Sequence, residues 1–385
     1  MQIVVNRQDL LTVLKRAGSA VNSSDMLSVR RSVLIVASED GGPITFGATD
    51  GMLGIVCQAA GETKAPGQAL LNHRELVSRI DRLPEGHVQI SVDAKFHVLI
   101  RSSSSKMKFT MTGLAPEDFP ALLNEQPGEP MYSLEAKILQ QAASEVAFGI
   151  AKDRIDGALL APGDDMKFHL VTLSGHAMVV ATGWFTERHQ GGDLLLPRTL
   201  LEAIGSIDPK AILTLSTDTS SIYAQVPGML VRASQLQAKL PADFQRVLAS
   251  APQHKRFTVS SEAFLTSVKA VSVAADYVEG AERFIQIDVT CDEGVVTVRT
   301  RQSERSQGED ELSVTHAAPG GFAFHADAAV LSQALRSFAP ADLDLYYDFV
   351  MGYETLFLKN ETLAVMMTLI SDIKAKPHAA AKDKK

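Results

Sequence analysis

The feature that most constrains this chain is a pattern that occurs three times. In each copy a strand-like segment leads into small or apolar residues at positions 5, 9 and 12 after its last residue. This spacing is typical of a strand that feeds an amphipathic helix. The copies start 129 and 125 residues apart, which is the size of a domain and too long for a solenoid repeat. The three stripes are Leu10, Leu14 and Ala17, then Leu139, Ala143 and Val146, then Phe264, Val268 and Val271.

Each copy also contains a second helix and a pair of later strands. We expect the second helices at 72–83, 197–207 and 327–338, the second of them with proline at its first position, where a missing N–H costs nothing. Alternating apolar runs follow each helix, and they predict two strands per copy. These runs are 88–92 with 98–101, 212–215 with 222–226, and 343–347 with 355–358. Each copy therefore reads as an α+β domain with two helices on antiparallel sheets.

A shared closing motif and two linkers place the domain boundaries. The motif Pro-x-Asp-Phe, followed by two apolar residues, ends the first copy at Phe119 and recurs at Phe244. Segments rich in Pro, Gly and Glu, or in Ala and Pro, follow it and are typical of linkers. We predict clamp-type domains at 1–123, 130–250 and 255–370, and a flexible Lys/Ala-rich tail at 371–385.

Three such domains in a row form an arc with two unlike ends. An arc of this kind pairs head to tail with a second copy and closes into a ring. We therefore expect a homodimeric ring of six domains around a central hole.

The composition excludes several classes of protein. The 385 residues carry a net charge of −8, which argues against a broad basic surface for nucleic acid but not against local contacts inside a hole. No apolar run approaches a membrane span and no signal peptide is visible, so we expect a cytoplasmic protein. Cys57 and Cys291 are expected to be free, buried thiols. No Cys/His cluster has zinc spacing, so neither metal nor cofactor is expected.

At this point the sequence resembles the bacterial DNA polymerase III beta subunit family, the replicative sliding clamps, from Met1 to about Ile370. No single motif is specific for this family, but the order of the motifs along a chain with a threefold repeat is. The motifs are Val5-x-Arg7-x-x-Leu10-Leu11, Leu83-Pro84-Glu85-Gly86, Asp118-Phe119-Pro120, Ile155-Asp156-Gly157, Ser174-Gly175-His176, Leu196-Pro197-Arg198, Phe244-x-Arg246-Val247-Leu248 and Val365-Met366-Met367.

The resemblance implies a non-enzymatic processivity factor. Its partners would be double-stranded DNA without sequence preference, a clamp loader, and DNA polymerase III alpha and other polymerases or repair proteins that dock through short hydrophobic peptides. It also implies a peptide pocket between the second and third domains. We expect that pocket to be lined by Ile155, Leu173, Gly175, His176, Met178, Pro241, Arg246, Val247, Val365 and Met367.

Departures from the family pattern make this pocket more apolar. The family reads Thr-Asp-Gly-His-Arg-Leu where this chain reads Leu-Ser-Gly-His-Ala-Met at 173–178, and Met-Pro-Met-Arg where it reads Met-Thr-Leu-Ile at 367–370. We therefore expect leucine or phenylalanine anchors to matter more for binding, and polar peptide residues to matter less. The alternative interpretation is that most of these residues belong to an ordinary core between the domains.

Cations gather on the predicted helices of the first copy. If those helices face the hole, the cations contact phosphates in a weak, salt-sensitive way that permits sliding. A solvated helix face is the alternative. The resemblance adds loop and helix positions from the second domain. The candidates are Lys15, Arg16, Arg74, Arg79, Arg82, Lys152, Arg154 and Arg198.

The dimer interface is expected to be apolar at both ends of the arc. By resemblance, Phe109 and Met111 lie on one edge and Val271 and Val273 on the other, with buried core as the alternative for each.

Three other functions stay open. A clamp-like paralogue serving repair or a mobile replicon would show the same repeats. A hydrolase would use Ser174 with His176 as its base, but no orienting carboxylate or Gly-x-Ser-x-Gly elbow accompanies them. A self-assembling ring without DNA is the third, and the cationic helices argue mildly against it.

Overall fold

The computed structural model describes residues 1–117, 119–120, 126–151, 155–175, 177–189, 191–238, 244–274, 285–300, 307–338, 340–350 and 353–369. The chain divides into two compact units. The first comprises Met1–Gln141, Asp156–Phe168 and Gly183–Ala238, and the second comprises Ala142–Ile155, His169–Thr182 and Lys239–Lys385. The three predicted domain boundaries stay a prediction.

The first unit contains two antiparallel sheets and a strand pair. In the nine-stranded sheet, β4 (Leu53–Ala59) pairs with β18 (Met229–Ser234), and Cys57 is opposite Met229. The five-stranded sheet runs β5 (Gly61–Ala65), β1 (Gln2–Asn6), β7 (His87–Val92), β8 (His97–Ser102), β9 (Lys108–Thr112). The nine-stranded sheet runs β14 (Glu187–Arg188), β10 (Pro130–Glu135), β16 (Ile212–Thr217), β17 (Ser221–Val226), β18 (Met229–Ser234), β4 (Leu53–Ala59), β3 (Ile44–Thr49), β2 (Ser32–Ala37), β6 (Gly67–Asn72), and β11 (Gly157–Pro162) pairs with β15 (Leu194–Pro197).

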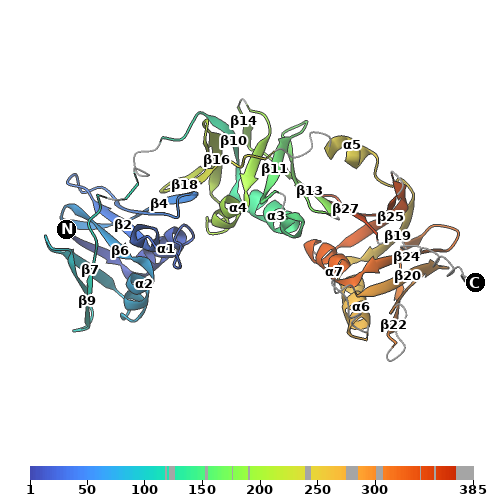
Figure 1. The fold of residues 1–385 in the computed structure, drawn as a ribbon, viewed down its shortest axis with the longest axis horizontal. Coiled ribbons are helices and arrows are strands. Elements are labelled where there is room, and N and C mark those ends of the chain that lie inside the picture. Colours follow the sequence, from blue (N-terminus) through green and yellow to red (C-terminus); the bar gives the residue numbers. More distant parts are fainter. Residues whose placement is uncertain are drawn as a thin grey trace, which may run out of the picture. The chain divides into compact units, whose positions relative to one another are not determined.

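Two helices of the first unit, α1 (Arg7–Gly18) and α2 (His73–Asp81), begin where the sequence supplies a side-chain cap. The Asn6 side chain accepts a hydrogen bond from the N–H of Gln8 at the start of α1, and Asn72 caps the next helix in the same way. The predicted stripe of α1 is buried, and α1 packs against its neighbour α2 and against β3 and β4 (Figure 1). The helices are α1 (Arg7–Gly18), α2 (His73–Asp81), α4 (Arg198–Ile204), the short η1 (Ser28–Arg31), and α3 (Ala136–Val146), which runs into the second unit.

Arg7 ties α1 to the end of α2. Its guanidinium donates to the carbonyl oxygens of Ile80 and Asp81, at 3.1 and 2.7 Å, and to a carboxylate oxygen of Glu85 at 3.0 Å. These carbonyls belong to the last turn of α2, where backbone acceptors lack partners within the helix. Arg7 is therefore a structural residue that holds the two helices together.

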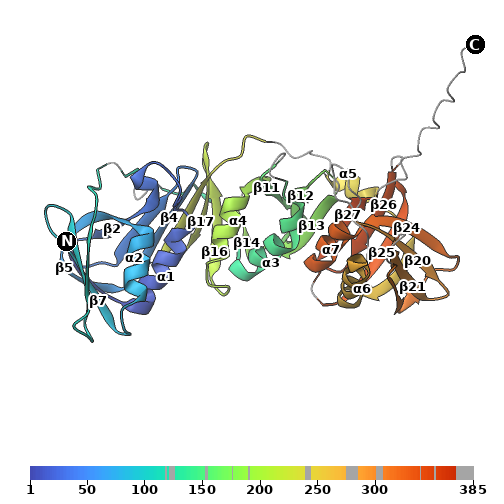
Figure 2. The same ribbon diagram turned by 60° about the horizontal axis from the view of Figure 1, so that its bottom comes forward.

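The second unit repeats the arrangement with different strands. Figure 2 shows its helices α6 and α7 side by side, and they are in contact. One sheet runs β12 (Lys167–Leu173), β13 (Ala177–Trp184), β27 (Leu363–Thr368), β26 (Tyr353–Lys359), β25 (Asp342–Val350), β19 (Lys255–Ser260), β23 (His316–Ala317), and the other runs β22 (Glu309–Ser313), β21 (Val295–Thr300), β20 (Gln286–Asp292), β24 (Phe322–Asp327). The helices are α5 (Phe244–Ala249), α6 (Ser261–Val273), α7 (Ala328–Ser337) and the short η3 (Ala147–Gly149).

The two cysteines are free and buried, as predicted. Burial raises the pKa of the Cys57 thiol to about 12 and also raises that of Cys291. Both are therefore protonated and unreactive at neutral pH. Within the described ranges, no helix is long and apolar enough to cross a bilayer.

Candidate functional site

An apolar cavity of about 210 Å³ lies within the second unit. Its walls come from the turn between β12 and β13, from α5, from the hairpin of β25 and β26, and from β27. None of its lining side chains is charged, so it suits an apolar ligand better than a phosphate. The lining residues are Leu173, Ser174, Gly175, Ala177, Met178, Val247, Ser250, Val350, Tyr353, Thr355, Met366 and Thr368.

Four of the predicted pocket residues line this cavity, and two others lie on the wrong face of their strand. Leu173, Gly175, Met178 and Val247 are in the wall. Val365 and Met367 are not, because they are buried in the core on the opposite face of β27.

The register of β27 explains the correction. Met366 is paired with Met178 on β13, and residues opposite each other in antiparallel strands share a face. Side chains alternate along a strand, so an error of one residue moves every predicted contact to the other face. The wall of the cavity therefore contains Met366 and Thr368 instead of Val365 and Met367.

The other predicted pocket residues are not part of the wall. Ile155 is half-buried and forms an isolated bridge with Ala151, and Arg246 is exposed on α5. Neither side chain lines the cavity. His176 and Pro241 lie outside the described residues.

The sequence interpretation missed the contribution of the hairpin of β25 and β26. It predicted that the first strand ends at 347 and that the second begins at 355. In the structure β25 continues to Val350 and β26 begins at Tyr353, and these two residues are paired. Both line the cavity, and Tyr353 is 62% exposed at its mouth. The aromatic and β-branched residues Tyr346, Tyr347, Phe349 and Val350, which are common in strands, were the available signal.

Three of the predicted DNA-facing cations have no salt-bridge partner among the described residues. Lys15, Arg74 and Arg82 are exposed on α1, on α2 and at the end of α2. Arg79 forms an ion pair with Glu75 at 2.9 Å. Arg16 is half-buried and donates to the carbonyl oxygen of Ser206 at 3.3 Å.

Arg198 is engaged within the first unit. Its guanidinium lies 2.7 Å from carboxylate oxygens of both Asp156 and Glu202, and the hydrogen bond that it donates to Asp156 is the main cause of the raised pKa of Arg198. Two carboxylates around one cation leave this position without positive charge to offer DNA. The predicted role of Arg198 as a DNA contact is therefore not supported by its surroundings. Lys152 and Arg154 lie outside the described residues.

Strands β9 and β22 are both five residues long, and each has a sheet neighbour on one side only within the described part of the chain. Their charges are opposite. β9 begins with Lys108, whereas β22 begins with Glu309, Asp310 and Glu311. A lone sheet edge exposes backbone N–H and C=O groups that pair readily with another strand.

The predicted interface residues lie near these two strands. On β9, Phe109 is half-buried and Met111 is 8% exposed. Near β22, Val273 is 87% exposed at the end of α6. Val271 is only 2% exposed because it belongs to the buried stripe of α6, so it has almost no surface to offer a partner.

Comparison with known proteins agrees with this architecture. Residues 1–123 match the model of the family described as DNA polymerase III beta subunit, N-terminal domain. The chain is 22% identical over 303 residues to a beta sliding clamp of Synechocystis sp., covering 72% of this chain and 76% of the relative. It is 21% identical over 321 residues to a beta sliding clamp of Chlamydia pneumoniae, covering 82% and 84%.

Solved structures show the same fold. A putative DNA polymerase III beta subunit from Eubacterium rectale superposes with a TM-score of 0.84 at 18% identity, over 96% of this chain and 100% of that one. The DNA polymerase sliding clamp of Bacillus subtilis gives 0.83 at 15% identity, over 96% and 99%. The family's model thus covers the first 123 residues of this chain, and the fold of the solved clamps covers 96% of it.

The surroundings of Ser174 do not support the hydrolase alternative. The Ser174 hydroxyl donates to the carbonyl oxygen of Ala177 at 3.2 Å and accepts from the N–H of Ala177 at 3.0 Å. It therefore stabilises the turn between β12 and β13. No group of three or more His, Cys, Asp or Glu residues suited to a metal ion occurs among the described residues.

Proposed function

We propose that this chain is a DNA sliding clamp that encircles duplex DNA as a head-to-tail homodimer and tethers a polymerase to it as a processivity factor. In this role the protein acts in the cytoplasm, is placed on DNA by a clamp loader, and needs no catalytic group of its own. Polymerases, DNA polymerase III alpha among them, and repair proteins dock on it through short hydrophobic peptides.

The observation that carries the proposal is the uncharged cavity of the second unit. Met178 and Met366 supply adaptable thioether side chains, and Val247 and Val350 supply branched ones. A wall without charge gives DNA nothing to bind, but it accepts one or two apolar side chains of an extended peptide. Binding there should therefore depend weakly on salt.

The charge distribution supports enclosure of DNA in preference to tight binding. The whole chain carries a net charge of −8, while Lys15, Arg74 and Arg82 are free of carboxylate partners among the described residues. A few phosphate contacts give weak affinity that falls with salt. Weak contacts let a closed ring slide.

The two edge strands provide a way to close the ring. Pairing β9 of one copy with β22 of another would continue both sheets. Lys108 shares a sheet face with Thr110, and Glu311 shares one with Glu309, each on the face away from the buried side chains of its sheet. Because Arg299 already forms a salt bridge with Glu309 at 2.8 Å, Glu311 is the acid that would face Lys108 in such a pairing.

Charge reversal tests this interface. Lys108→Glu and Glu311→Lys should each shift the protein toward the monomer in sedimentation, and the double variant should restore the dimer. Monomeric wild type at micromolar concentration, or no rescue by the double variant, would contradict the pairing.

Two adjacent methionines provide a matched test of the cavity. Met366 lines the cavity and Met367 is buried behind it. A fluorescent peptide with a Leu-Phe anchor should bind the wild type with micromolar affinity, and Met366→Ala should weaken binding roughly tenfold. Met367→Ala should lower stability and leave peptide affinity within about twofold. Equal effects of the two substitutions on affinity, or no binding to the wild type at about 1 mM, would reject the cavity as the docking site.

A further inference from the structure

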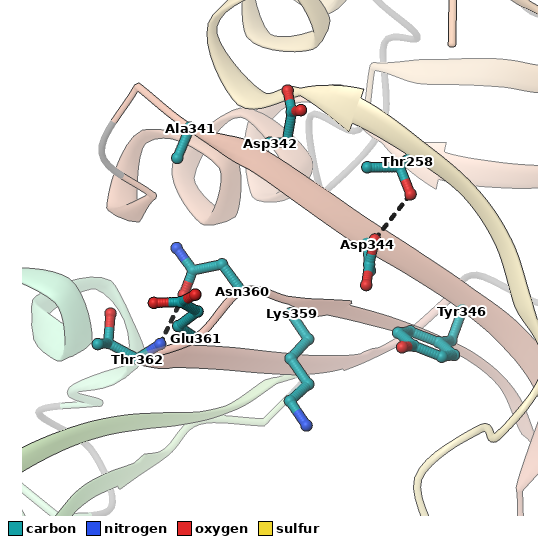
Figure 3. A pocket seen from close by; sticks show the side chains of 9 residues that line it. All are labelled: Thr258, Ala341, Asp342, Asp344, Tyr346, Lys359, Asn360, Glu361 and Thr362. Carbon is teal, nitrogen blue, oxygen red and sulfur yellow. Dashed lines mark hydrogen bonds between the residues drawn. The ribbon is translucent and has the colours of Figure 1, made fainter. Parts of the chain in front are cut away.

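A second cavity, of about 570 Å³, lies at the other end of β25 and β26 (Figure 3). The apolar cavity is at the hairpin end, near Val350 and Tyr353, whereas this one is at the start of β25 and the end of β26. Its wall is polar where the first is apolar. The lining residues are Thr258, Ala341, Asp342, Asp344, Tyr346, Lys359, Asn360, Glu361 and Thr362.

Strand register places both cavities on one face of the same sheet. Asp344 is opposite Lys359, Tyr346 is opposite Phe357, and Val350 is opposite Tyr353. Opposed residues share a face, and so do residues two apart along a strand. The even-numbered residues of β25 therefore lead from the polar cavity to the apolar one on one continuous surface.

An aromatic pair occupies the boundary between the two cavities. The rings of Tyr346 and Phe357 lie 5.7 Å apart between centroids. Tyr346 also lines the polar cavity, and Phe357 is opposite Met366 of the apolar cavity. From Thr355 to Lys359 the strand advances about 13 Å, which is the length of four extended residues.

The polar cavity carries both satisfied and unsatisfied charges. Burial opposes ionisation of Asp344, but hydrogen bonds from Lys255 and Thr258, both 2.7 Å long, outweigh it and lower the pKa of this carboxyl group. Asp344 is thus an already paired carboxylate. Asp342 and Glu361 are exposed, and neither forms a salt bridge with a cation of the described residues. The one lysine of the wall, Lys359, is paired in the sheet with Asp344.

We infer that the polar cavity is a second subsite for the same partner peptide, and that it accepts a lysine or arginine about four to six residues from the apolar anchor. The inference rests on the proposed docking function of the apolar cavity. A peptide that lies extended along β26 reaches both cavities at once. Its cation then lies near the carboxylates of Asp342 and Glu361. The second subsite would thereby select among partners that share the same apolar anchor.

The test uses the full-length chain and a set of labelled peptides. Each peptide has a Leu-Phe anchor, a four-residue Gly/Ser spacer and either Lys-Lys or Ser-Ser, placed before the anchor in one series and after it in the other. In one of the two orientations, the Lys-Lys peptide should bind about three- to tenfold more tightly than its Ser-Ser counterpart at low salt. About 1 M salt should remove the difference.

Charge-matched variants show where that advantage arises. Asp342→Asn with Glu361→Gln should abolish the preference for Lys-Lys and leave Ser-Ser binding unchanged. Asp292→Asn with Glu262→Gln removes the same charge from exposed positions outside the groove and should keep the preference. Equal binding of Lys-Lys and Ser-Ser peptides in both orientations overturns the second subsite alone. Failure of every peptide to bind overturns the docking function on which it rests.

Discussion

The helix pair α1–α2 in the first unit and the pair α6–α7 in the second bury similar stripes but expose different surfaces. Leu10, Leu14 and Ala17 are fully buried on α1, and the corresponding Phe264, Val268 and Val271 are at most 2% exposed on α6. The first pair exposes the cations Lys15, Arg74 and Arg82 together with three acids, Asp9, Glu75 and Asp81, of which Glu75 and Asp81 are bound to Arg79 and Arg7. The second pair exposes only two cations, Lys269 and Arg336, beside one acid, Glu262, and small or neutral residues, Ala263, Thr266, Ala270, Ala329 and Gln333.

This comparison separates two kinds of information in the sequence. The buried stripe determines that a helix packs on its sheet, so it recurs with the fold. The exposed face is free to differ, so it can carry charge where the function needs it. We therefore expect the first helix pair to contribute more to DNA binding than the second, and both to contribute equally to stability.

The largest expected effect comes from the shared stripes. Leu14→Ala and Phe264→Ala should each lower the free energy of unfolding by about 2–5 kcal/mol, because each leaves a cavity in a core. Thr12→Ala and Thr266→Ala are matched controls, since each hydroxyl is exposed and bonds the carbonyl four residues earlier. They should change stability by about 0.5 kcal/mol or less in urea denaturation. If only one of Leu14→Ala and Phe264→Ala lowered the free energy of unfolding by more than its threonine control, the two helices would not be equivalent.

A smaller effect should separate the exposed faces. Arg74→Ala with Arg82→Ala removes two charges from the first pair, and Lys269→Ala with Arg336→Ala removes two from the second. At about 50 mM salt, affinity for a short linear duplex should fall roughly tenfold for the first variant and less than about twofold for the second. Fluorescence anisotropy measures both. Equal losses would mean that DNA does not distinguish the two helix pairs.

The smallest effect is expected at Arg198, where two carboxylates already surround the guanidinium. Arg198→Ala should leave duplex affinity within about twofold of wild type and lower stability by about 1 kcal/mol. A loss of affinity as large as that of the Arg74 and Arg82 variant would show that DNA displaces Asp156 and Glu202.

The helices were predictable because their signal is local. Offsets of i, i+4 and i+7 place residues on one helix face wherever the helix later packs. The predicted second helices agree with α2, α4 and α7 to within a few residues at each end. All six predicted later strands were likewise found, because alternation along a strand is also local.

The cavity was only partly predictable because its geometry depends on pairing between distant strands. Val365, Met366 and Met367 are all apolar, so alternation does not reveal which face of β27 they occupy. The register with Met178 decides it, and nothing near β27 in the sequence encodes that register. The ion pair between Arg198 and Asp156 could not be predicted either, because Asp156 is 42 residues away along the chain.

The central claim is that the chain holds DNA by encircling it, and topology tests this most directly. The clamp is loaded onto a nicked circular duplex with its clamp loader, isolated by gel filtration, and the circle is then cut once with a restriction enzyme. The account predicts that the protein stays with the closed circle and is released after the single cut, because weak phosphate contacts alone do not retain it. Retention that is the same before and after cutting would contradict enclosure.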